Sequence, residues 1–201
     1  MEYVVAQVNI GRLVAPLDSP EVADFVAGLD LVNAAADSAP GFVWRMQTED
    51  GNATAVRGFE WATAAPDKAG SDGGIIINMS VWERVEALAA YVYGPAHVAV
   101  LRRRREWFKR MTLAYAALWW IPSGHIPTVT EAEDRVKHLR LYGPTPYAFT
   151  LRAHFPPGSY LPAGRPTVPL EGPPDEETPT YRTDHADPDP VYSPDDWTCP
   201  V

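Results

Sequence analysis

The residues whose types and spacing could do chemistry are concentrated in residues 91–108, YVYGPAHVAVLRRRREWF. A Gly-Pro turn leads at once into a predicted helix that carries His97 near its start and Arg104 two turns later. Together with Trp107 and several apolar side chains they follow i, i+3, i+4, i+7 spacing and share one stripe. Neutral imidazole can ligate a metal ion or transfer a proton, and a guanidinium can anchor an anion. The stripe therefore predicts a polar cavity beneath this helix.

A purely structural interpretation of the same stripe also stands. His97 could cap its own helix, and Arg104 could extend past the core to water or pair with a buried carboxylate. The three neighbouring arginines, Arg102, Arg103 and Arg105, fall on other faces and are expected to be solvated. Because buried polar groups usually need partners, two of them on one inward stripe favour the cavity.

Strand-like and helix-like segments alternate along the first 155 residues. The predicted strands are Val4–Ile10, Phe42–Thr48, Ile75–Trp82, Leu113–Ile121 and Tyr147–Phe155, with a further short candidate at Val56–Trp61. The predicted helices run from Pro20 to Ala36, Glu83 to Tyr91, Ala96 to Arg110 and Val129 to Leu141. This order predicts an α+β domain of the ferredoxin-like split βαβ type, with an antiparallel sheet and helices on one face.

The composition changes at Pro156. Residues 156–201 hold twelve Pro, and nine Asp or Glu against two Arg. We therefore expect one ferredoxin-like domain over residues 1–155 and a Pro-rich acidic tail over residues 156–201. Such a tail is either disordered, because it buries little apolar surface, or an arm that wraps a partner subunit. Its candidate anchors are Tyr160, Tyr181, Tyr192 and Trp197.

Charge and cysteine content exclude several classes of protein. The chain has 201 residues, a formal net charge of −9 and 46% hydrophobic residues. The sequence predicts no basic face that could bind nucleic acid, and it has no apolar run long enough to cross a membrane. Cys199 is the single cysteine, so a disulfide framework is not expected. The first residues lack the features of a signal peptide, so we expect a cytoplasmic protein.

Several long stretches resemble one bacterial family, domain of unknown function 3291, over roughly residues 3–155. They include INMSVWERVEAL, YGPAHVAVLRRRREWF and LWWIPSGHIPTVTEAEDRVKHL, in the same order. The family is placed in the dimeric α/β-barrel superfamily with the antibiotic-biosynthesis monooxygenases. The resemblance implies a homodimer in which two ferredoxin-like sheets join into a barrel. It also implies a small-molecule cavity between sheet and helices in each subunit.

Within that superfamily, the haem-degrading monooxygenases are similar around VWERVEALAAYVYGPAH. The similarity implies Asn9 at the first-strand Asn position and His97 at the haem-iron ligand position. Tyr91 stands where those enzymes carry a Trp that distorts haem, which is a departure from their pattern. Related monooxygenases use no cofactor, and there a His at this position acts as an acid/base group. The resemblance therefore leaves two alternatives: the protein binds haem through His97, or it uses no cofactor.

The sequence thus leads to a monooxygenase-like small-molecule enzyme as the leading hypothesis. Its expected catalytic residues are His97, Asn9, Tyr91 and Arg104, and its expected substrate-binding residues are Trp107, Phe108, Trp120 and His125. Because strand residues alternate between faces, only one of Trp119 and Trp120 can face the cavity. A cofactor-free cyclase or isomerase of a biosynthetic pathway is the alternative enzyme. A non-enzymatic small-molecule binding protein is the alternative of another class.

Overall fold

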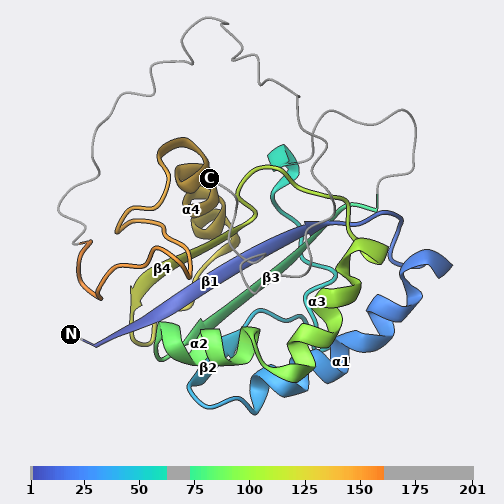
Figure 1. Cartoon of the computed structure of the whole chain (residues 1–201), viewed down its shortest axis with the longest axis horizontal. Coiled ribbons are helices and arrows are strands. Elements are labelled where there is room, and N and C mark those ends of the chain that lie inside the picture. Colours follow the sequence, from blue (N-terminus) through green and yellow to red (C-terminus); the bar gives the residue numbers. More distant parts are fainter. Residues whose placement is uncertain (1, 63–72, 161–201) are drawn as a thin grey trace, which may run out of the picture.

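The computed structural model describes residues 2–62 and 73–160, and within them four strands form one sheet in the order β2–β3–β1–β4 (Figure 1). The strands are β1 (Tyr3–Arg12), β2 (Phe42–Arg45), β3 (Ile75–Trp82) and β4 (Ala116–Pro122). All three neighbouring pairs are antiparallel. This order is that of the expected ferredoxin-like α+β fold. Residues 161–201, and with them most of the predicted tail, lie outside the described part.

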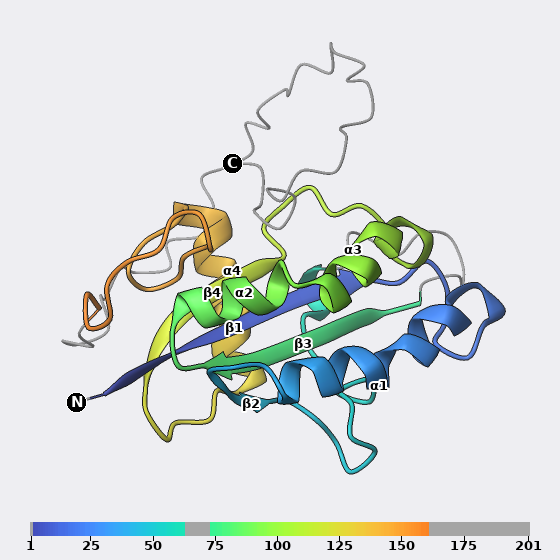
Figure 2. The ribbon, with the colours of Figure 1, turned by 60° about the horizontal axis from the view of Figure 1, so that its bottom comes forward.

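Helices cover both faces of the sheet. They are α1 (Ala23–Asp37), α2 (Val85–Val92), α3 (Pro95–Trp107) and α4 (Val129–Tyr142), with short 3-10 turns η1 (Pro20–Val22) and η2 (Glu60–Ala62). Helices α1, α2 and α3 lie on one face and α4 lies on the other (Figure 2). The expectation of helices on one face was wrong, because the second face also carries apolar side chains that α4 buries. None of the helices in the described residues is both long and apolar enough to cross a membrane.

The α4 side of the sheet holds the largest apolar cluster. Alternate residues of β1 and β3 point to this side, and each is at most 7% exposed. They are Val4, Ala6, Val8 and Ile10 from β1, and Ile77, Met79 and Val81 from β3. Ala132 and Val136 of α4 pack against them with no exposed surface. This side of the sheet therefore supplies most of the hydrophobic stabilisation.

On the three-helix side the apolar packing is divided between two ends. One cluster includes Trp82, Leu88 and Phe149, and the other includes Leu13, Val22, Phe25 and Trp107. The middle of this face is occupied instead by polar residues of β1 and β3. The fold thus leaves a polar zone between two packed ends.

Helix α3 begins and ends for local reasons. Gly94 precedes it in an extended conformation and Pro95 takes the first helical position, where its missing N–H costs nothing. The helix stops at Trp107, short of the predicted Arg110, because Phe108 turns to extended backbone and bridges Leu13. The Phe108 ring lies where a side chain on Gly11 would be, 2.7 Å from an added Cβ. Only glycine permits this approach.

Two expected strands are absent from the described residues. Residues 56–61 form an irregular segment that ends in η2. In Tyr147–Phe155, only Phe149 pairs with β4, through two 2.8 Å backbone hydrogen bonds with Leu118. The chain then turns at Thr150, whose side chain accepts from the Ala153 N–H. A single bridge is therefore all that forms at this edge.

Candidate functional site

A row of polar side chains crosses the centre of the three-helix face. Gln7 pairs with Ser80 across β1 and β3, and Asn9 pairs with Asn78 in the same register. Alternation along each strand places all four side chains on one face. Gln7 and Ser80 are each 6% exposed, Asn9 is half-buried and Asn78 is exposed. The row therefore runs from the interior out to solvent.

The buried end of this row is held by hydrogen bonds. The Gln7 Nε2 group donates to Ser80 Oγ at 3.2 Å and to Asn9 Oδ1 at 3.5 Å. The indole Nε1–H of Trp82 donates to the same Ser80 oxygen at 2.8 Å. Because both donors converge on one hydroxyl, the carboxamide of Gln7 is held in a fixed orientation.

The helices and β2 complete a small cavity over the row. Its lining residues are Gln7, Asn9, Asn33, Ala36, Arg45, Asn78, Ser80, Leu88, Tyr91, Val92 and His97. Its volume is about 20 Å³, which holds about one water molecule. Among the described residues that line it, none carries a carboxylate. The cavity is thus walled mainly by neutral polar groups, with one cation and the apolar residues Ala36, Leu88 and Val92.

His97 is the buried titratable group of this cavity, with 8% of its surface exposed. Its Nδ1 lies 3.1 Å from the carbonyl oxygen of Val92. A carbonyl only accepts, so Nδ1 carries the proton and the lone pair lies on Nε2. Burial lowers the pKa of His97 to about 4, and the Val92 bond offsets this only in part. His97 is therefore neutral at pH 7.

Tyr91 lies against His97, with ring centroids 5.0 Å apart. Its other neighbour is Trp82, which stacks on it at 5.1 Å and 27°. The phenol O–H donates to the Val32 carbonyl oxygen at 3.3 Å. Burial raises the pKa of Tyr91 to about 12. Tyr91 is thus a protonated, positioned phenol beside a neutral imidazole.

Arg45 supplies the positive charge. Its Nε donates to Asp37 Oδ1 at 2.7 Å and its Nη2 to Asp37 Oδ2 at 3.1 Å, a bidentate pair. Its Nη1 donates to the Gly51 carbonyl oxygen at 2.8 Å. The Arg45 side chain is 13% exposed and the Asp37 side chain is 46% exposed. The cation is therefore fixed at the cavity, while its counter-charge lies outside the lining and closer to water.

Three of the predicted catalytic residues, Asn9, Tyr91 and His97, meet at this cavity. The structure does not bring Arg104 to it, and the Nη1 of Arg104 donates to the Leu101 carbonyl oxygen at 3.0 Å. The prediction that Arg104 shares a site with His97, made because both lie on one helical stripe, was therefore wrong. Arg104 is seven positions after His97, which is about 10 Å along a helix.

Trp107 and Phe108, predicted to bind substrate, belong to the apolar cluster at the far end of α3. Trp107 is 3% exposed and packs on Phe25 with ring centroids 5.7 Å apart. Phe108 meets the same Phe25 ring edge-on at 5.0 Å. Both side chains therefore fix α3 against α1 and do not line the cavity.

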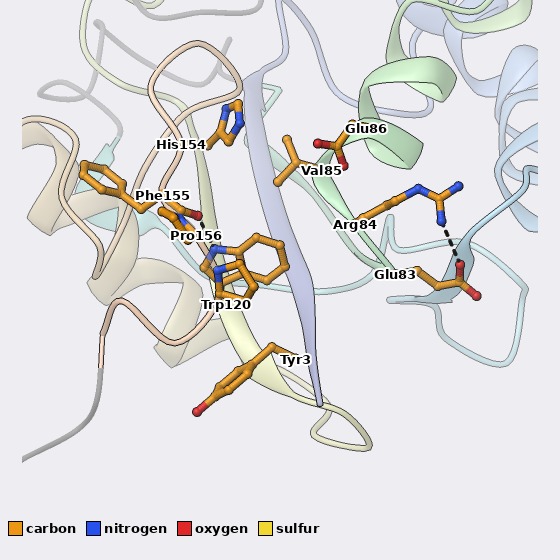
Figure 3. A pocket seen from close by; sticks show the side chains of 10 residues that line it. Tyr3, Glu83, Arg84, Val85, Glu86, Trp120, His154, Phe155 and Pro156 are labelled. Atoms are coloured by element: carbon orange, nitrogen blue, oxygen red, sulfur yellow. Dashed lines mark hydrogen bonds and ion pairs between the residues drawn. The ribbon is translucent and has the colours of Figure 1, made fainter. Parts of the chain in front are cut away.

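Trp120 and His125 also lie away from the cavity. Trp119 points to the α4 side, where its Nε1–H donates to Glu131 Oε1 at 2.8 Å. Trp120 points to the opposite side and lines a different groove, shown in Figure 3. His125 is in an exposed loop, with Nε2 2.9 Å from Glu131 Oε2. Neither residue meets His97.

Sequence reasoning missed Gln7, Asn78, Ser80, Asn33 and Arg45. A signal for three of them is present in the printed sequence. The segments AQVNI (residues 6–10) and INMSV (residues 77–81) each carry polar residues at alternate positions of an apolar strand. Polar residues at strand period within a buried sheet indicate a polar face. No comparable pattern marks Asn33 or Arg45.

The residues around His97 do not fit haem. A volume of about 20 Å³ is far below the several hundred Å³ that small-molecule cofactors occupy. The lining is mainly carboxamide, hydroxyl and guanidinium, and not the apolar slot that a porphyrin requires. Among residues 2–62 and 73–160, no three His, Cys, Asp or Glu side chains group as a metal site.

The chain belongs to the family described as Domain of unknown function (DUF3291), which matches residues 4–163. Among solved structures it is similar to SnoaB, a cofactor-independent oxygenase from Streptomyces nogalater, at 13% identity and a TM-score of 0.35. That likeness covers 63% of this chain and 97% of the other. Rv0793 from Mycobacterium tuberculosis shows 13% identity and a TM-score of 0.36, with 62% and 99% covered. At these scores neither likeness carries an argument about activity. No curated protein matches the chain.

Proposed function

We propose that this protein is a small-molecule, monooxygenase-like enzyme that works without haem in the cavity between β1, β3 and helices α1–α3. The observation that carries the proposal is His97 itself. It is buried, neutral and held as the Nδ1–H tautomer, so the lone pair on Nε2 is the atom that would accept a proton from a substrate. The polar groups that line the cavity with it are carboxamides, hydroxyls and one arginine, and no carboxylate is among the described lining residues.

The first step we propose is proton transfer from the substrate to His97. The fitting substrate class is an electron-rich aromatic ketone or phenol with an acidic C–H next to the ring. Loss of that proton places negative charge on the substrate oxygen, where the amide N–H groups of Asn9 and Asn78 can stabilise it. The same negative charge raises the proton affinity of His97 while it forms.

The second step uses dioxygen as the oxidant. The carbanion transfers an electron to O2, and the two radicals combine into a carbon-bound peroxide. Protonation from His97 and loss of water then leave a carbonyl, so that CH2 and O2 become C=O and H2O. The protein holds and moves the proton, while the substrate itself supplies the electrons.

The substrate lies mainly at the mouth of the cavity in this proposal. The enclosed space admits about one water, so only the reacting edge reaches His97. Asn78 is exposed and Asn9 is half-buried, so the polar row continues from the interior to the surface. A planar aromatic body can therefore rest on the outer part of the row.

The test is oxygen consumption with the anthrone dithranol as probe, corrected for its uncatalysed oxidation. We expect saturable turnover that falls at least ~100-fold in His97→Gln, the usual cost of removing a general base. The Gln side chain can still form hydrogen bonds but has no basic nitrogen. The control is Arg103→Gln, on the exposed side of the same helix, which should leave turnover unchanged.

Each alternative outcome would indicate a different class of function for this protein. Exchange of the probe's C–H for solvent deuterium without oxygen uptake would indicate the cyclase or isomerase class. Saturable binding with the probe recovered unchanged and unexchanged would indicate a binding protein. Equal turnover in wild type and His97→Gln would contradict the role of His97.

A further inference from the structure

A second, larger hollow lies at one end of the three-helix face, where β1, β4 and the start of α2 meet. Its volume is about 480 Å³, and it is open to solvent (Figure 3). It is lined by Tyr3, Glu83, Arg84, Val85, Glu86, Trp120, His154, Phe155, Pro156 and Pro157. We call this hollow the Trp120 groove. None of its residues lines the His97 cavity.

One wall of the Trp120 groove is aromatic and the other is charged. Trp120 and Phe155 lie on one side, and Glu83, Arg84 and Glu86 lie on the other (Figure 3). The indole Nε1–H of Trp120 donates to the Phe155 carbonyl oxygen at 2.6 Å. This bond fixes the orientation of the ring, which contributes an apolar surface to this wall of the groove.

The charged wall carries an excess of negative charge. Arg84 Nη1 lies 3.6 Å from Glu83 Oε2, and both side chains are about 60% exposed. Glu86 adds a second carboxylate in the first turn of α2. A ligand of this groove should therefore combine flat apolar groups with one positive charge.

Aromatic-lined grooves of this kind bind proline-rich segments, because the polyproline II helix is extended and loses little entropy on binding. Residues 161–170 of this chain read LPAGRPTVPL, with Arg165 as the single charged residue. Pro166 and Pro169 are three residues apart, so a polyproline II helix, with three residues per turn, would present both on the same side. We propose that the Trp120 groove is the docking site for Arg165–Pro169 of the same chain.

The chain can reach the groove. Pro157 lines it, and Tyr160 follows three residues later, so Tyr160 lies within about 11 Å of Pro157. Residues 161–165 span up to about 18 Å when extended, which is enough to turn back. In the docking that we propose, Arg165 would lie beside Glu83 and Glu86, and the two prolines would pack on the aromatic wall.

The later prolines of the chain fit less well. From Glu171 onward the sequence is strongly acidic, with EGPPDEE at residues 171–177. Docking of that stretch would place several carboxylates against Glu83 and Glu86, and like charges repel. Charge thus selects residues 165–169 over the neighbouring Pro173-Pro174 pair.

The test is amide hydrogen exchange of the full-length protein, together with the indole N–H resonance of Trp120. Pro has no N–H, so the informative amides are those of Arg165, Thr167 and Val168. We expect their exchange to be at least tenfold slower than in Pro166→Ala/Pro169→Ala, and the Trp120 resonance to shift in that variant. The matched control is Pro173→Ala/Pro174→Ala, which should change neither.

A charge swap sharpens the test. Arg165→Glu should remove the protection, and Arg165→Glu combined with Glu86→Arg should restore it. Fast exchange in the wild type, or equal exchange in all variants, would overturn the proposal. Protection that falls on dilution would show that the segment of a second copy fills the groove, which would overturn docking within one chain. None of these readouts depends on catalysis, so they stand apart from the function proposed above.

Discussion

On the α4 side of the sheet, alternate residues of β1 and β3 are all apolar, whereas on the three-helix side the same strands present Gln7, Asn9, Asn78 and Ser80. Both faces belong to the same two strands, so the backbone and the strand register are the same for both and only the side chains differ. Burying a polar group costs free energy unless it gains a hydrogen bond, and Gln7 and Ser80 gain such bonds. The polar face therefore depends on hydrogen bonds for its stability, whereas the other face depends on apolar burial. Polar residues at the centre of a buried sheet face mark a candidate site, which is why the proposed function is placed there.

The largest effect on stability is expected from a substitution on the apolar face. Ile77 is 1% exposed and packs in the cluster covered by α4. We expect Ile77→Ala to lower the free energy of unfolding by about 2–5 kcal/mol, because it removes buried methyl groups and leaves a cavity. Urea denaturation followed by circular dichroism measures this. A loss below about 1 kcal/mol would mean that α4 does not close tightly over the strands.

The sheet and helix pattern could be predicted because it depends on local periodicity. Ile75–Trp82 was predicted to the residue, since a β-branched run bounded by turn residues has one plausible structure. Which face α4 covers could not be predicted in the same way. That choice depends on how long-range packing buries Val136 and Ala132, and the helix sequence alone does not name its partner strand.

The candidate site was predicted only in part. Asn9, Tyr91 and His97 were expected together because of the resemblance to the haem-degrading monooxygenases, and they line one cavity. Arg104 and Trp107 were grouped with His97 because they share its helical stripe. A stripe fixes direction around the helix axis but not position along it, and the two ends of α3 pack against different neighbours.

The second prediction concerns His97 and pH. Its pKa is about 4 in the folded protein, against an ordinary value of 6.5. Between these values the unfolded chain binds a proton that the folded protein does not. The contribution of neutral, buried His97 to the free energy of unfolding is therefore fully present above pH 6.5. As the pH falls toward 4 this contribution is lost, and the free energy of unfolding decreases by up to about 3 kcal/mol. Denaturation midpoints measured from pH 7.5 to 4 test this.

The matched control for that series is His97→Gln, which keeps a polar side chain that does not titrate. Carboxylates elsewhere in the chain affect both proteins equally, so the difference between the two curves isolates His97. Tyr91, with a pKa of about 12, does not titrate in this range. Parallel curves for the two proteins would contradict the burial of His97.

The smallest effect on stability is expected at Asn78, the next residue along β3 from Ile77 but on the other face. Asn78 is exposed at the mouth of the cavity, and substitutions at such positions usually change the free energy of unfolding by no more than about 0.5 kcal/mol. Asn78→Ala should therefore unfold like the wild type, while binding of the dithranol probe weakens. If Asn78→Ala instead destabilised the protein as Ile77→Ala does, the polar face would be structural, and the contrast between the two faces would disappear.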